Sequence, residues 1–198
     1  ELVTFEVDQD GKLSTELGGV KVFMGLTPIP LLYVSAGQLG AIVPYGVSTQ
    51  QSINVRVEYM NRTSQEAEVA IAKASAGVFT LNVTGQGAIV NQDGTVNGVS
   101  DPAAAGSIVS IFGTGAGLMT PAHPDGLIIP LAVDPLPRPE LPLSVEIGGV
   151  RAKVYYAGGA PALPNGMLQL NVEIPAELGP GVYDVIVRIG ESVSPPGV

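Results

Sequence analysis

The sequence of 198 residues contains no cysteine, no tryptophan and a single histidine, His123. The lack of cysteine excludes disulfides, thiolate-ligated zinc, iron–sulfur clusters and thiol nucleophiles. A Ser–His–Asp triad would have to use His123, and no Gly-x-Ser-x-Gly motif accompanies it. We therefore predict that the protein is not an enzyme and that it has no catalytic, metal-ligating or cofactor-binding residues.

Charged residues are also scarce, and their balance is acidic. They make up 14% of the chain, with 18 Asp and Glu against 9 Lys and Arg, for a net charge of −9. A nucleic-acid-binding protein needs a basic patch, whereas the cations here are scattered singly. No run of about 18 apolar residues is present, which excludes a membrane-spanning helix. We expect neither nucleic acid nor an anionic membrane as a partner.

Glycine and proline are abundant, and short runs of alternating apolar and polar residues lie between them. The chain has 26 Gly and 17 Pro. Alternation with a period of two is typical of strands with one buried face. It is clearest at Ile53–Tyr59, Leu168–Ile174 and Tyr183–Ile189. Further strands are expected at Leu2–Val7, Val20–Met24, Leu31–Val34, Leu39–Val43, Glu68–Ala72, Val78–Asn82, Ala88–Asn91, Ile108–Phe112, Leu143–Ile147 and Ala152–Tyr156.

The chain also repeats itself. Gln38-Leu39 begins an alternating run that ends at Pro44, and Gln169-Leu170 begins a similar run that ends at Pro175. Two repeats of many short strands suit two Ig-sized domains rather than a solenoid. We predict an all-β fold of two tandem Ig-like β-sandwich domains, Glu1–Ala74 and Ser75–Val198. Inward-facing positions should include Val55, Val57, Leu170, Val172, Val185 and Val187.

Two segments of the second domain have no counterpart in the first. Val78–Ala105 contains Asn91-Gln92-Asp93-Gly94, in which Asp-Gly signals a tight turn and predicts a β-hairpin insertion. Pro121–Pro142 carries seven prolines, so it cannot lie inside a sheet. We interpret it as a Pro-rich excursion over the surface of the second domain.

Two loops suggest a calcium site. Val7-Asp8-Gln9-Asp10-Gly11 and Val90-Asn91-Gln92-Asp93-Gly94 each supply two oxygens and a glycine. Neither has the distal Glu that completes a calcium loop. An Asp-Gly hairpin turn is the favoured interpretation of both, and calcium binding stays open.

Three further features suggest a ligand, and each has a simpler structural interpretation. Gly113–Gly117 lacks the following helix that a phosphate-binding loop requires, which favours a bulge or a sharp crossing. His123 lies between prolines, as an exposed loop residue would. Six tyrosines could stack on sugars, although most of their positions favour packing: Tyr33, Tyr45, Tyr59, Tyr155, Tyr156 and Tyr183.

A set of longer motifs resembles one known family. The motifs are Pro30–Gln38, Val43–Tyr45, Gly77–Leu81, Gly85–Gly94, Gly106–Gly115, Ile147–Val150 and Tyr156–Gly158. In this order, from about Leu17 to Val198, they resemble the Solibacter-type uncharacterised C-terminal domain family of secreted acidobacterial proteins. The resemblance implies tandem Ig-like sandwiches of an exported protein and carries no catalytic motif. The chain departs from the family in having no large N-terminal module and in ending at Val198, where the family continues with a short apolar strand.

These observations set the functional expectation. A chain that begins at Glu1 without an apolar signal segment fits a processed secreted protein or a trimmed one, and we predict an extracellular or cell-surface location. We predict a non-enzymatic structural or adhesive protein, a filament subunit that self-associates by β-strand exchange. The alternative is a carbohydrate-binding accessory module of a secreted protein.

The strand-exchange hypothesis depends on the two ends of the chain. After Tyr183–Ile189 the sequence turns through Gly190–Pro196 and stops before a closing strand, so the second domain is expected to expose a sheet edge. Glu1–Val7 of a neighbouring copy could fill that edge and build a head-to-tail filament. Two alternatives stay open: the chain continues past Val198, or Glu1–Val7 belongs to the first domain.

Overall fold

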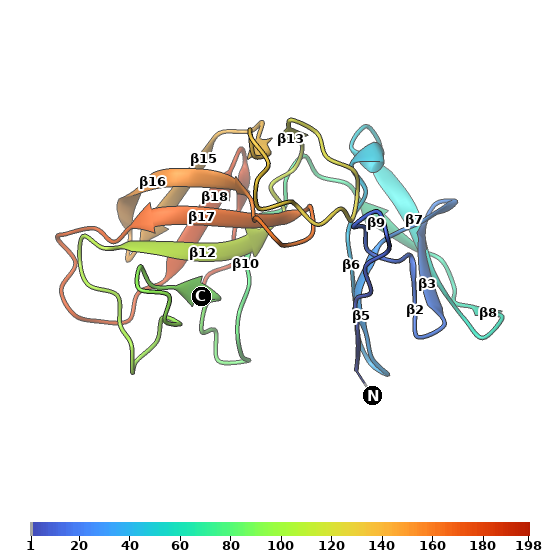
Figure 1. Cartoon of the computed structure of the whole chain (residues 1–198), viewed down its shortest axis with the longest axis horizontal. Coiled ribbons are helices and arrows are strands. Elements are labelled where there is room, and N and C mark those ends of the chain that lie inside the picture. Colours follow the sequence, from blue (N-terminus) through green and yellow to red (C-terminus); the bar gives the residue numbers. More distant parts are fainter. Residues whose placement is uncertain (1) are drawn as a thin grey trace. The chain divides into compact units, whose positions relative to one another are not determined.

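The computed structural model of the protein describes residues 2–198 and is all-β, which confirms the predicted class (Figure 1). One 3-10 turn, Tyr45–Val47, interrupts the strands. No helix within residues 2–198 has the length and apolar character that crossing a membrane requires. The chain divides into two compact units. The first unit contains residues 2–73, His123–Val133 and Pro161–Gly166, and the second contains Ala74–Ala122, Asp134–Ala160 and Met167–Val198.

The first unit has two antiparallel sheets. The smaller has the order β1-β5-β6, formed by β1 (Val3–Thr4), β5 (Leu31–Val34) and β6 (Leu39–Ala41). The larger has the order β2-β3-β7-β8, formed by β2 (Glu16–Leu17), β3 (Val20–Met24), β7 (Ser52–Tyr59) and β8 (Arg62–Thr63). Two short strands extend it: β4 (Thr27–Pro28) pairs with β3, and β9 (Ala67–Ala70) pairs with β7.

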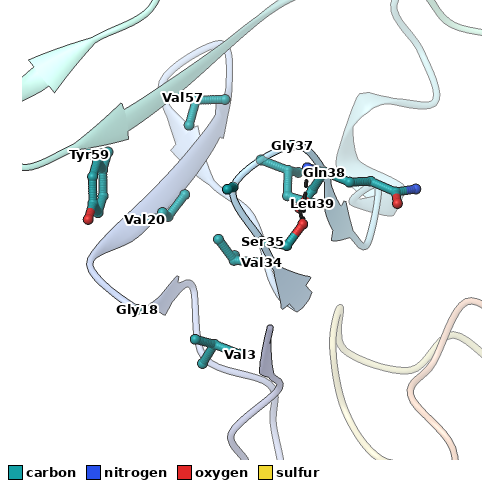
Figure 2. A pocket seen from close by; sticks show the side chains of 11 residues that line it. Val3, Gly18, Val20, Val34, Ser35, Gly37, Gln38, Leu39, Val57 and Tyr59 are labelled. Atoms are coloured by element: carbon teal, nitrogen blue, oxygen red, sulfur yellow. Dashed lines mark hydrogen bonds between the residues drawn. The ribbon is translucent and has the colours of Figure 1, made fainter. Parts of the chain in front are cut away.

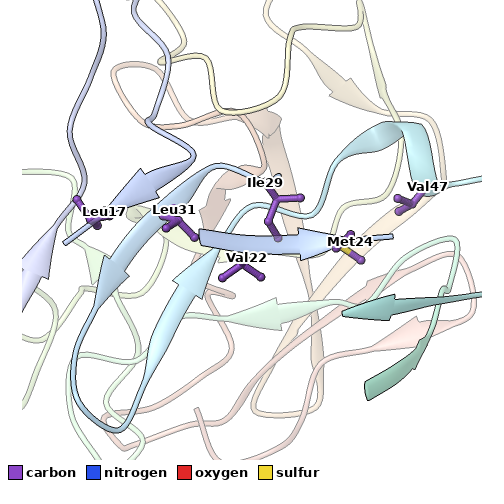
Figure 3. Close-up of a cluster of buried hydrophobic side chains, with 6 residues drawn as sticks. All are labelled: Leu17, Val22, Met24, Ile29, Leu31 and Val47. Atoms are coloured by element: carbon purple, nitrogen blue, oxygen red, sulfur yellow. The ribbon is translucent and has the colours of Figure 1, made fainter. Parts of the chain in front are cut away.

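One hydrophobic core joins these two sheets (Figure 3). Its buried side chains are Leu17, Val22, Met24, Ile29, Leu31 and Val47. Val34 and Leu39 of the small sheet and Val55 and Val57 of β7 contact the same cluster while remaining partly exposed. The predicted inward positions on β7 therefore do face the core, but this core is incompletely covered.

The Pro-rich segment corrects one expectation. We expected all of Pro121–Pro142 to cover the second domain, whereas His123–Val133 belongs to the first unit. Its backbone groups find partners there, because the N–H of Leu13 donates to the carbonyl of Gly126 at 2.9 Å and that of Ile128 donates to Gly11 at 2.8 Å. Ile129 is fully buried. The proline content indicated that this segment lies outside the main sheet. It did not indicate which part of the chain the backbone of the segment bonds to.

The second unit is built on an eight-stranded sheet with the order β10-β12-β17-β16-β15-β18-β19, with β11 also paired to β12. The strands are β10 (Gly77–Val78), β11 (Ile89–Val90), β12 (Ile108–Thr114), β15 (Leu143–Ile147), β16 (Val150–Gly159), β17 (Met167–Glu173), β18 (Val185–Ile189) and β19 (Ser192–Val193). A separate pair joins β13 (Met119–Thr120) to β14 (Arg138–Pro139).

The long strand β16 connects the two halves of this sheet. Val150–Ala152 pairs with β15, whereas Lys153–Gly159 pairs with β17. A bulge at Tyr155 separates two of the registers with β17, and bulges bend a strand and increase its twist. The predicted inward residues of both halves are at most 5% exposed: Leu170, Val172, Val185 and Val187.

The internal repeat is present in the strand pairing. In the first unit β3 pairs with β7, β5 with β6, and β7 with β8. In the second unit β15 pairs with β18, β16 with β17, and β18 with β19. One element differs between the units. All seven residues of β17 pair with β12, whereas β6, the equivalent of β17, is the last strand of its sheet.

The ends of the chain do not form the edge that we expected. β19 pairs with Arg188 and Ile189 of β18, and the N–H of Ser194 donates to the carbonyl of Val187 at 2.9 Å. The N–H of Val185 donates to the carbonyl of Val198 at 2.6 Å. The C-terminal segment thus covers the edge of β18, and the expected gap in the second unit is wrong. At the other end, β1 pairs with β5 of the first unit.

Candidate functional site

An apolar groove of about 750 Å³ opens between the two sheets of the first unit (Figure 2). None of its lining side chains is charged, and most are aliphatic. Covering a water-exposed apolar surface of this kind with another apolar group lowers the free energy, because it removes that surface from water. The lining residues are Val3, Gly18, Val20, Val34, Ser35, Ala36, Gly37, Gln38, Leu39, Val57 and Tyr59.

The hairpin between β5 and β6 forms one wall of the groove. Its turn is fixed by Ser35, whose N–H and hydroxyl both donate to the carbonyl of Gln38, at 2.8 Å and 2.9 Å. Gly40 lies opposite Tyr33. A Cβ atom on Gly40 would lie 2.5 Å from that ring, so any other residue there would force the Tyr33 ring to shift. The wall is therefore held in place by local interactions.

The outer edge of β6 offers unpaired backbone groups beside the groove. The N–H of Ile42 donates to Pro30 on the β5 side, and the carbonyl of Gln38 accepts from Ser35 on the same side. Because backbone groups alternate in direction along an antiparallel strand, those of Leu39 and Ala41 point away from β5. Among the described residues no strand pairs with β6 there. Such an edge is a template for an added strand.

The N-terminal strand is weakly held and only partly covered. β1 pairs with β5 at two positions, Val3 with Val34 and Thr4 with Tyr33. Three apolar side chains of this segment are exposed: Leu2 (62%), Phe5 (43%) and Val7 (46%). Val3 lines the groove itself. Groove, open edge and exposed N-terminal segment thus belong to one region of the first unit, which we call the β6 site.

The two Asp-Gly loops have turn geometry. Asp8 Oδ1 accepts from the N–H groups of Asp10 and Lys12, both at 2.9 Å. Asp93 Oδ1 accepts from the N–H and the hydroxyl of Thr95, at 3.0 Å and 2.7 Å. The hydrogen bonds from Thr95 lower the pKa of Asp93. Within residues 2–198, no three His, Cys, Asp or Glu side chains come together in a way that could hold a metal ion.

The glycine-rich segment 113–117 permits close strand packing. Gly113 lies opposite Val78 of β10, and a Cβ atom on it would lie 2.5 Å from the carbonyl oxygen of Gly77. Gly115 has a φ of +79° and its carbonyl accepts from the N–H of Ser75 at 2.9 Å. The glycines therefore serve the contact between β10 and the end of β12.

His123 and Asp125 both accept hydrogen bonds within the first unit, His123 through its backbone carbonyl and Asp125 through its side chain. Asp125 accepts from the N–H of Tyr45 at 3.0 Å. The carbonyl of His123 accepts from the amide nitrogen of Asn165 at 3.0 Å. The hydroxyl of Tyr45 donates to Asn165 Oδ1 at 3.4 Å. Burial, and secondarily the charge of Asp125, raises the pKa of Tyr45 to about 12.

The six tyrosines are dispersed rather than gathered into one platform. Tyr59 lines the groove, and Tyr183 packs over Gly148 with its hydroxyl donating to Gly179 at 3.0 Å. Tyr155 and Tyr156 lie together on β16.

Comparisons with protein-family models, curated proteins and solved structures gave no match to this chain.

The β6 site was not found from the sequence. Alternation at Leu39–Val43 predicts a strand, but it does not say which neighbours the strand has. Leu2–Val7 is expected as an alternating strand before β5, but in the structure this segment forms only the two-residue β1, which pairs with β5 and not with β6. Asn165 was also missed, since Pro-Asn-Gly in a sequence indicates only a turn.

Proposed function

We propose that this protein is a non-enzymatic extracellular structural or adhesive protein, made of two Ig-like β-sandwiches, that self-associates by strand exchange at the β6 site. One observation carries the proposal: β6 has an open edge beside an apolar groove, whereas the equivalent strand β17 is paired along its length with β12. The first unit is therefore one strand short by comparison with the second. The extracellular setting is supported by the sequence resemblance described above.

The strand added to β6 is the N-terminal segment of a second copy. Its Val3, Phe5 and Val7 alternate on one apolar side of the segment, and the last two are 43% and 46% exposed in the single chain. Releasing this segment would break the two residue pairs of β1 with β5, the bridge between Val7 and Leu13, and the hydrogen bond from the N–H of Ser14 to the carbonyl of Glu6. In the exchanged state these side chains would cover the groove, and the backbone would pair with Leu39 and Ala41. Donation from each copy to the next does not close on itself, so it builds a filament.

Engineered cysteines test this arrangement, because the natural chain has none. Val3 pairs with Val34, which pairs with Leu39, so Val3 and Leu39 lie two strand spacings apart, about 10 Å. A disulfide needs Cα atoms within about 7 Å. Oxidation of Leu39→Cys combined with Val3→Cys, Phe5→Cys or Val7→Cys should therefore cross-link only different copies.

The expected result is a ladder of covalent oligomers on a non-reducing gel for at least one of these three pairs, which represent the possible registers. The pair Arg188→Cys and Val193→Cys is the control, since these residues face each other between β18 and β19 of one chain. It should give closed monomers. Monomers from all three test pairs at high protein concentration would contradict strand exchange at β6.

A further inference from the structure

The outward face of the second unit's sheet carries a polar row that self-association at β6 does not use. Along β12 and β17, buried residues alternate with half-buried ones on the other face of the sheet. Ser110 lies opposite Asn171, and Asn171 lies opposite Tyr156 of β16. Three adjacent strands thus contribute to one row across the sheet.

Two amide side chains in this row are fixed by hydrogen bonds. Asn171 Oδ1 accepts from Ser110 Oγ at 3.1 Å and from Gln169 Nε2 at 2.9 Å. These contacts engage the oxygen of Asn171 and the nitrogen of Gln169. The amide nitrogen of Asn171 and the amide oxygen of Gln169 have no hydrogen-bond partner among residues 2–198. A donor on Asn171 and an acceptor on Gln169, two residues apart on β17, are therefore available to a ligand.

Aromatic side chains flank the amides. Phe112 lies opposite Gln169 on the same half-buried face. Tyr155 is 50% exposed at the bulge of β16, and its hydroxyl donates to Glu173 at 2.6 Å. Lys153 Nζ lies 4.4 Å from the centre of the Tyr155 ring. These contacts orient Tyr155 at the end of the polar row.

We propose that this face binds a neutral glycan chain. Vicinal sugar hydroxyls present a donor and an acceptor together, which matches the paired amides, and sugar C–H faces stack on aromatic rings. The charges also select the ligand class. β12 has no charged residue, and Glu173 is the only one on β17. Lys153 lies over the ring of Tyr155 and Arg138 over that of Tyr156, so the face itself is not acidic. The net charge of −9 on the chain disfavours the approach of a polyanionic glycan and leaves a neutral one unaffected.

Affinity electrophoresis tests the proposal with soluble neutral polysaccharides in the gel: hydroxyethylcellulose, arabinoxylan, galactomannan, β-1,3-glucan and starch, with alginate as a polyanion. The variant is Asn171→Asp, which removes the amide donor but keeps the shape. Its control is Asn61→Asp, the same change at an exposed hairpin turn of the first unit. A thermal melt of each variant verifies folding, and Gln169→Ala is a second test of the same row.

At least one neutral polysaccharide should retard the native protein, and Asn171→Asp should weaken its binding by about tenfold, the equivalent of one strong hydrogen bond. Asn61→Asp should match the native protein. Retardation by none of the neutral polymers, preference for alginate, or equal binding by folded Asn171→Asp and Gln169→Ala would overturn the proposal. Loss of self-association in Asn171→Asp without glycan binding would assign the face to contact between copies instead. Strand exchange at β6 is tested separately by the disulfide cross-linking experiment, so glycan binding and strand exchange can each be contradicted independently.

Discussion

The amide nitrogen of Asn165 donates to the carbonyl oxygen of Pro124 at 3.1 Å, across 41 residues of sequence. It also donates to the carbonyl of His123, and the side chain is fully buried. Asn165 thereby joins the two segments, His123–Val133 and Pro161–Gly166, that complete the first unit from the second half of the chain.

Asn165→Asp should destabilise the first unit strongly. One oxygen of the new carboxylate would keep the Tyr45 hydroxyl as its donor, whereas the other would face the carbonyl oxygens of His123 and Pro124. A buried charge that is not properly paired costs about 3–5 kcal/mol. Chemical denaturation monitored by tyrosine fluorescence measures the loss. The exposed Asn61→Asp should stay within about 0.5 kcal/mol of the native protein. Equal free energies of unfolding for both variants would show that the Asn165 contacts do not hold the segments.

Alkaline pH should weaken the fold through Tyr45. Its pKa is raised from the ordinary value of 10.0 to about 12 by burial and by Asp125. Between these two pH values the folded state keeps a proton that the unfolded state has lost. The contribution is fully present below about pH 10 and disappears as the pH rises toward 12. Its size is on the order of 1 kcal/mol once partial exposure is allowed for.

Spectrophotometric titration of the tyrosines provides the measurement for Tyr45. The native protein should show a late-ionising component, and Tyr45→Phe should lose part of it together with part of the stability decline above pH 10. The pKa of Tyr156 is also raised by burial, so some late ionisation should remain. An unchanged titration curve in Tyr45→Phe would contradict the assignment.

The two faces of β17 should respond differently to substitution. Val172 is 0% exposed in the core of the second unit, and Val172→Asp places an unpaired charge there at a cost of about 3–5 kcal/mol. Glu173 is the next residue on the opposite face, where it accepts from Tyr155. Glu173→Ala should cost less than about 1 kcal/mol. Thermal melts of both variants compare the faces, and equal shifts would contradict the burial pattern.

The sequence was informative about strands and less informative about their partners. Three strands have the predicted bounds: Val20–Met24, Leu31–Val34 and Leu143–Ile147. A short run of strand-forming residues bounded by Gly or Pro is a local property, so the sequence shows it directly. Two-residue strands such as β19 have too few residues to show a period. The closing contact of Val198 with Val185 and the open edge of β6 depend on which backbone groups meet across the fold. No local pattern specifies them.

The role of β6 is tested most directly by the size of two matched proline variants. In Ala41→Pro the ring removes the N–H that faces the open edge, and edge strands tolerate proline at such positions. Ala70→Pro is the control: it lies on the edge strand β9, where the N–H of Ile71 donates toward β7, so that of Ala70 faces outward.

Analytical ultracentrifugation across a concentration series gives the decisive comparison. Strand exchange at β6 predicts concentration-dependent polymers for the native protein and for Ala70→Pro, and folded monomers for Ala41→Pro. A native protein that stays monomeric at high concentration, or a folded Ala41→Pro that assembles as the native protein does, would contradict it.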